Sequence, residues 1–137
     1  MVFFMIIVGI DPSLSRSAYS VIDVSKDFTL QLLNKDFTLQ NKDKSKYFTL
    51  NKSCNKYFTL LKTSYFKTST KDHQLDRLNK IYHWFYNEIC NLKYSHKNLA
   101  ICIEESFVSA NSKTSILLGM VRSSVALACL HSLRNFI

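Results

Sequence analysis

Two short apolar runs, each ending in an acidic residue, are the clearest pattern in this sequence. The first is MIIVGI at residues 5–10, which ends in Asp11, and the second is LAICI at residues 99–103, which ends in Glu104. Continuous runs this short and this rich in Ile and Val are typical of strands buried on both faces of a sheet. The turn-forming residues DPSLSRS follow the first run, and we interpret the apolar stretch at residues 18–24 as its antiparallel return strand.

An amphipathic stretch between these runs predicts a helix. Apolar residues recur there at three- and four-residue spacings, which gives the helix one apolar face. The residues on that face are Leu75, Leu78, Tyr82, Phe85 and Ile89. We expect the helix to open at Asp72, with Asp72 and Asp76 in its first turn, where the helix dipole favours acidic side chains.

The chain after residue 110 predicts a second helix of a different kind. Residues 114–133 are apolar almost all round, so we expect this helix to be covered on several sides. We expect Asn111 or Ser112 to be its N-cap. Gly119 costs a helix about 1 kcal/mol relative to alanine, so we expect it to pack closely against another backbone.

A repeated unit occupies much of the region between the return strand and the first helix. Four copies of the sequence FTL place Phe28, Phe37, Phe48 and Phe58 nine to eleven residues apart, between Asn, Lys and Ser residues. Lysines beside aromatic rings could bind single-stranded nucleic acid, but a repeat expansion within a surface hairpin is the simpler interpretation. We therefore treat residues 25–71 as an insertion that could contribute a third antiparallel strand.

The order of the elements predicts an α/β fold, a mixed sheet flanked by helices. With a third antiparallel strand in place, the strand at residues 99–103 would lie parallel to the strand at residues 5–10. Asp11 and Glu104 would then meet at one edge of the sheet, where two carboxylates require a hard cation, Mg²⁺ or Mn²⁺. Such an ion on a basic protein suggests phosphodiester cleavage. Taken singly, Asp11 could be an ordinary turn acid and Glu104 a solvated charge.

The composition limits the class of protein. The chain has 137 residues, 47% of them hydrophobic, which fits a single domain with a real core. Its 18 basic and 10 acidic residues give a net charge of +8, which fits either a polyanionic partner or a merely lysine-rich surface. The four cysteines share no metal-type spacing, and the apolar start MVFFMIIVGI is too short to span a bilayer. We expect reduced, packed thiols in a cytoplasmic protein that has no membrane segment.

Two stretches of the sequence resemble motifs of RuvC, the family of bacterial Holliday junction resolvases with a ribonuclease-H-like fold. They are VGIDPSLSRSAYSVI and ICIEESFVSANSKTSILLGMVRSSVALAC. The resemblance implies that Asp11 and Glu104 are the catalytic metal ligands. It also implies that Phe107 contacts junction DNA close to the site.

The second of these stretches adds further candidates. The resemblance implies that the helix with Gly119 and Arg122 takes part in dimerisation. Asn111 stands at the family's spacing after Glu104, and we take it, with Lys113 and Arg122, as a candidate for DNA binding. Four-way junction DNA, a second copy of the chain and branch-migration helicases are the partners that the resemblance implies.

The sequence also departs from the RuvC pattern. The insertion at residues 25–71 has no counterpart in the family. This sequence also has no Asp or Glu after Glu105, whereas the family has further acidic metal ligands there. We therefore predict one domain over residues 1–137, a ribonuclease-H-like sheet without the family's C-terminal strand and helix. The predicted function is metal-dependent resolution of Holliday junctions, with little or no cleavage because part of the ligand set is missing. An inactive DNA-binding remnant and a YqgF-like RNA-processing nuclease are the alternatives.

Overall fold

A computed structural model describes residues 5–24, 58–96, 98–105 and 111–134 of the chain. Four strands and two helices lie within these residues. They are β1 (Met5–Asp11), β2 (Arg16–Val24), β3 (Phe58–Lys67), α2 (Gln74–Ser95), β4 (Leu99–Ile103) and α3 (Ser112–Arg134). Three of the four FTL copies, and with them any role in binding nucleic acid, fall outside the described residues, as do Phe107 and Cys54.

The strands form one mixed sheet in the order β3-β2-β1-β4. The strands β1 and β2 are antiparallel, β2 and β3 are antiparallel, and β4 lies parallel to β1. The predicted mixed α/β sheet is therefore confirmed, including the third antiparallel strand from the repeat region. That strand, β3, opens on the FTL of the last repeat copy, at Phe58.

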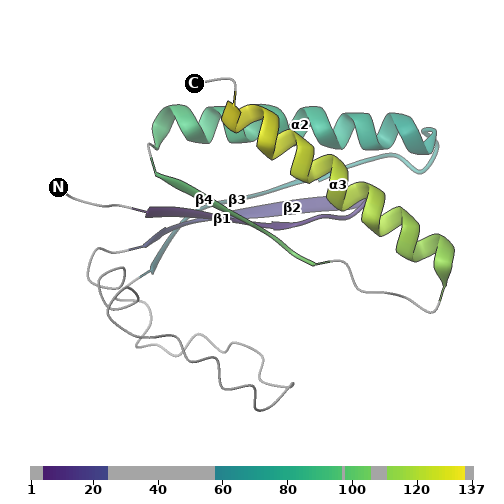
Figure 1. Cartoon of the computed structure of the whole chain (residues 1–137), viewed down its shortest axis with the longest axis horizontal. Helices are drawn as coiled ribbons and strands as arrows, with labels where there is room; N and C mark the ends of the chain where they lie inside the picture. The colour runs from purple at the N-terminus through teal and green to yellow at the C-terminus, as the bar shows by residue number, and fades with distance from the viewer. Residues whose placement is uncertain (1–4, 25–57, 97, 106–110, 135–137) are drawn as a thin grey trace, which may run out of the picture.

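Both helices lie on the same face of this sheet (Figure 1). Residues Ile6, Val8 and Ile10 of β1 are buried on that face, whereas the residues between them are only half-buried. The core is completed by Tyr19, Val21, Leu78, Ile81, Phe85, Ile89, Leu92, Val121, Val125, Ala128 and Cys129. The expectation of strands buried on both faces is thus met on one face only, because the described chain places no helix on the other.

The cysteines follow the same division between the two faces of the sheet. Cys129 lies in the core, and burial raises the pKa of its thiol to about 11. Cys102 is exposed, because it shares a row with Gly9 on the face that the helices leave open. The described cysteines are free thiols, but the prediction that they are packed was wrong for Cys102.

The helix α2 begins two residues later than expected. Its N-cap is His73, whose Nδ1 accepts a hydrogen bond from the Leu75 backbone N–H at 3.4 Å. Asp76 lies in the first turn as predicted, but Asp72 precedes the helix and its carboxylate pairs with Lys80 at 2.7 Å. Asp72 is therefore stabilised by a lysine two turns along and not by the helix dipole.

The helix α3 is capped by Asn111, one of the two predicted caps. The Asn111 side-chain Oδ1 accepts a hydrogen bond from the Lys113 backbone N–H at 3.0 Å. Gly119 contradicts its prediction, because a Cβ at this position would meet nothing within 4 Å. By length and mean hydropathy α3 could cross a membrane, although Val121 and Val125 on one side of it are fully buried in the core.

Candidate metal-binding site

Asp11 and Glu104 occupy neighbouring positions at the carboxyl ends of β1 and β4. The parallel register pairs Ile10 with Ile103, and the Glu104 backbone N–H donates to the Ile10 carbonyl oxygen at 2.8 Å. Asp11 and Glu104 each follow this pair by one position, on strands that lie about 4.8 Å apart. Both side chains are exposed. The predicted meeting of these two residues at one sheet edge is therefore present in the fold, while their roles remain predictions.

The carboxylate oxygens of Asp11 and Glu104 fit a hard cation that takes only a few of its ligands from the protein. Magnesium is commonly held by one or two carboxylates and keeps several waters, which suits two exposed acids such as Asp11 and Glu104. Among the described residues no group of three or more His, Cys, Asp or Glu side chains could hold a metal ion. Asp72, which precedes α2, is paired with Lys80.

The turn that follows Asp11 is fixed by its own serines. The Ser17 hydroxyl donates to the Ser13 carbonyl oxygen at 2.6 Å and accepts from the Ser13 backbone N–H at 3.0 Å. Ser17 is fully buried, so this pair of bonds is shielded from water. The serine closes the turn between β1 and β2 and limits how far the backbone after Asp11 moves.

The same turn is held from the outside by α2 and by the end of β3. The Arg77 guanidinium donates to the Leu14 carbonyl oxygen at 3.3 Å and, through Nε, to the Thr68 hydroxyl at 2.8 Å. The Thr68 hydroxyl also donates to Leu14, and its backbone N–H donates to the Ser15 carbonyl oxygen at 3.2 Å. The sequence carries no local signal for the roles of Arg77 and Thr68, since their partner Leu14 lies 63 and 54 residues away from them.

Of the DNA-binding candidates on α3, Arg122 reaches the end of β4. Arg122 donates through Nε to the Glu104 carbonyl oxygen at 3.3 Å, which ties α3 to the residue after β4. Asn111 and Lys113 stand at the N-terminus of α3, where the Asn111 side chain is engaged in the cap. Lys113 and Arg122 are exposed. Phe107 belongs to the residues that the structure does not describe.

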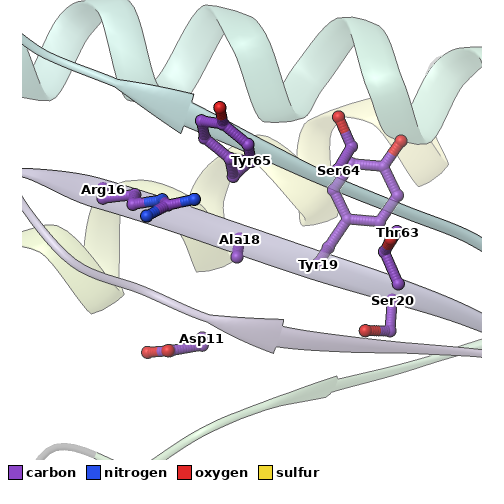
Figure 2. A pocket seen from close by; sticks show the side chains of 8 residues that line it. All are labelled: Asp11, Arg16, Ala18, Tyr19, Ser20, Thr63, Ser64 and Tyr65. Carbon is purple, nitrogen blue, oxygen red and sulfur yellow. The ribbon is translucent and has the colours of Figure 1, made fainter.

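A hollow of about 520 Å³ opens beside Asp11, on the sheet face opposite the helices (Figure 2). It extends from Asp11 across β2 to β3. The residues that line it are Asp11, Arg16, Ala18, Tyr19, Ser20, Thr63, Ser64 and Tyr65. Of these residues, only Asp11 is predicted from the sequence to be a site residue.

Comparison with known proteins places the fold. No protein-family model and no curated protein matches the sequence. Two solved structures of RuvC from Thermus thermophilus are similar in fold. The first, described as RuvC in complex with Holliday junction substrate, gives a TM-score of 0.57 at 15% sequence identity over 93% of this chain. The second, described as a RuvC structure, gives 0.55 at 18% identity over the same share of the chain.

The coverage and the sequence identity define how far this structural similarity extends. This chain spans 59% of the length of each RuvC chain, so the match does not reach the whole of those proteins. At 15% and 18% identity, the likeness concerns the arrangement of strands and helices. The chain therefore has a ribonuclease-H-like fold of the kind found in RuvC.

Proposed function

We propose that this chain is a metal-dependent nuclease that acts on four-way DNA junctions. The observation that carries the proposal is the meeting of Asp11 and Glu104 at the ends of two parallel strands. The fold supports it, since one solved structure with this fold is of RuvC in complex with a Holliday junction substrate. The net charge of +8 supports a polyanionic substrate.

In this proposal each part of the site has a physical task. Asp11 and Glu104 hold a divalent cation, Mg²⁺ or Mn²⁺, through carboxylate oxygens. When bound, the ion would make a water more acidic and stabilise negative charge on the phosphate. The bonds of Ser17 and Arg77 keep the turn after Asp11 in place, and Arg122 does so for Glu104. Because the described residues supply only two carboxylates, we expect weak cation binding and slow cleavage.

The test compares the two proposed ligands, Asp11 and Glu104, with the neighbouring acid Glu105. Asp11→Asn and Glu104→Gln should each weaken Mn²⁺ binding by roughly 10–100-fold or more. Loss of a residue that only hydrogen-bonds to a metal ligand already costs that much, and these two residues are the proposed ligands themselves. The same variants should abolish the slow cleavage of a labelled four-way junction. Glu105→Gln removes the same charge one residue further on and should leave both properties unchanged. Calorimetric titration and a gel assay of the cleaved strands measure them.

Other outcomes identify the alternatives. Salt-sensitive junction binding with no cleavage, and with no response to Asp11→Asn, would show a DNA-binding remnant. Cleavage of structured RNA in preference to four-way DNA would show a YqgF-like nuclease. Equal effects of Glu104→Gln and Glu105→Gln would show that the pairing of Asp11 with Glu104 does not define the site.

A further inference from the structure

The hollow beside Asp11 has a floor of small side chains. Paired residues on neighbouring strands present their side chains on the same face, and the register pairs Asp11 with Ala18 and Ala18 with Tyr65. The next row contains Ser20 paired with Thr63. Small side chains in the middle of both rows leave space between Asp11 on one side and Tyr65 on the other (Figure 2).

The wall of the hollow carries a cation that is held in place by an aromatic ring. The Arg16 guanidinium carbon lies 4.0 Å from the centroid of the Tyr65 ring, within the range of a cation–π contact. Lys67, the register partner of Arg16, has its Nζ 6.0 Å from the same centroid. Tyr65 is 53% exposed, so the ring serves as a platform at the surface and not as part of the core.

These two cations are not neutralised within the part of the chain that the structure describes. The ion pairs there join Lys62 to Glu88 and Lys80 to Asp72, and neither includes Arg16 or Lys67. Although Asp11 lines the same hollow, it forms no ion pair with Arg16. A guanidinium fixed at the rim of an open hollow, with its charge unpaired, is suited to a phosphate group.

We propose that Arg16, positioned by Tyr65, binds a backbone phosphate of the DNA strand that passes the Asp11–Glu104 edge. The proposal rests on the proposed function, since that function places a DNA strand at this edge. Lys67 adds charge to the same side of the hollow. The small floor of Ala18 and Ser20 lets the strand approach the sheet without a clash. Arg16 is thus a substrate-binding residue and Tyr65 a positioning residue.

The test measures binding to a labelled four-way DNA junction in EDTA, so that no metal and no cleavage are involved. Arg16→Gln should weaken binding about tenfold, because it removes charged hydrogen bonds to phosphate. It should also lower the slope of log Kd against log salt by about 0.9, the value expected for one lost phosphate contact. Arg134→Gln removes the same charge at the last residue of α3, a helix on the other face of the sheet from the hollow (Figure 1), and should change neither quantity.

A second pair of variants tests the role of the ring. Tyr65→Phe keeps the platform and should bind as tightly as the original protein. Tyr65→Leu removes it and should weaken binding several-fold while Arg16 is still present. Both residues are exposed, and circular dichroism verifies that each variant folds. A salt slope that Arg16→Gln and Arg134→Gln lower equally would overturn the proposal, as would equal binding by Tyr65→Phe and Tyr65→Leu.

The readout separates this proposal from the proposed function. If the junction is bound through Arg16 but never cleaved with Mg²⁺ or Mn²⁺, the phosphate site stands and the nuclease proposal fails. If the junction is cleaved in an Asp11-dependent way while Arg16→Gln binds normally, the nuclease proposal stands and the phosphate site fails.

Discussion

At the scale of single residues, a partly exposed hydrogen-bond network links three elements of the fold. The Tyr19 hydroxyl on β2 donates to a Glu88 carboxylate oxygen on α2, and the Lys62 ammonium on β3 donates to the same oxygen at 2.8 Å. Burial raises the pKa of Glu88, but the hydrogen bonds from Lys62 and Tyr19 outweigh it and leave the pKa below its usual 4.5. Burial and the bond to Glu88 raise the pKa of Tyr19 above 10.0.

This network predicts a loss of stability in acid. Because the pKa of Glu88 is lower in the folded than in the unfolded chain, its contribution is present above pH 4.5 and is lost as the pH falls through the folded value. Glu88→Gln should flatten this acid limb and cost about 1 kcal/mol at neutral pH. Urea unfolding between pH 3 and pH 7 measures both effects, with the exposed Glu105→Gln as control. An acid limb that is unchanged in Glu88→Gln would contradict the prediction.

The sequence predicted that Asp11 and Glu104 lie close together, but it did not predict contacts between side chains that are distant in the sequence. Asp11 and Glu104 could be found because each ends an apolar run, and the strand order then brings them to the same edge. Glu88, by contrast, sits in an amphipathic helix like any surface acid, and its partner Tyr19 lies 69 residues away. The Arg16–Tyr65 stack was missed for the same reason, since it depends on the register of β2 against β3.

At the scale of the elements, β3 is held to α2 by aromatic stacking. Phe66 on β3 stacks on Trp84 of α2, with ring centroids 5.5 Å apart and planes 19° from parallel. Trp84 also contacts the Tyr19 ring at 5.5 Å. The FTL repeats predicted a strand in this region but not which copy forms it. The copy at Phe58 opens β3, and the residues after it place Lys62 and Phe66 on the face that meets α2.

The stacking makes the single tryptophan of the chain a probe of β3. Phe66→Ala should lower the free energy of unfolding by about 2 kcal/mol, less than for a fully buried phenylalanine, because Phe66 is half-buried. It should also shift the Trp84 emission to longer wavelength, since the ring gains contact with water. Tyr65→Ala changes the neighbouring residue, on the open face of the sheet, and should leave the Trp84 emission unchanged. Equal spectra for Phe66→Ala and the original protein would show that β3 does not pack on α2.

At the scale of the whole molecule, part of the apolar surface of α3 is left uncovered by the residues that the structure describes. The all-round apolar character of α3 predicted cover on several sides, whereas the structure buries only the side that faces α2 and the sheet. Exposed apolar residues remain along its outer side, at spacings that keep them on one face of the helix. They are Ile116, Met120, Leu127 and Leu130. The periodicity of the sequence does not distinguish a helix buried by its own chain from a helix buried by a second molecule.

We expect that this outer face of α3 forms a homodimer, since its apolar side chains are otherwise left in water. Leu127 is 49% exposed, and Leu127→Glu would place a charge in the interface, so this variant should sediment as a monomer at concentrations where the original protein is a dimer. Leu61→Glu is the matched control, because Leu61 is 46% exposed but lies on β3, at the opposite edge of the sheet from β4.

The same dimer should appear in thermal unfolding. Association stabilises the folded state by mass action, so the Tm of the original protein should rise with protein concentration, while that of Leu127→Glu should not. Sedimentation velocity and calorimetry over the same concentration range test the two results together. A monomer at every concentration, or an equal loss of the dimer in Leu61→Glu, would show that the exposed side of α3 is not where two copies meet.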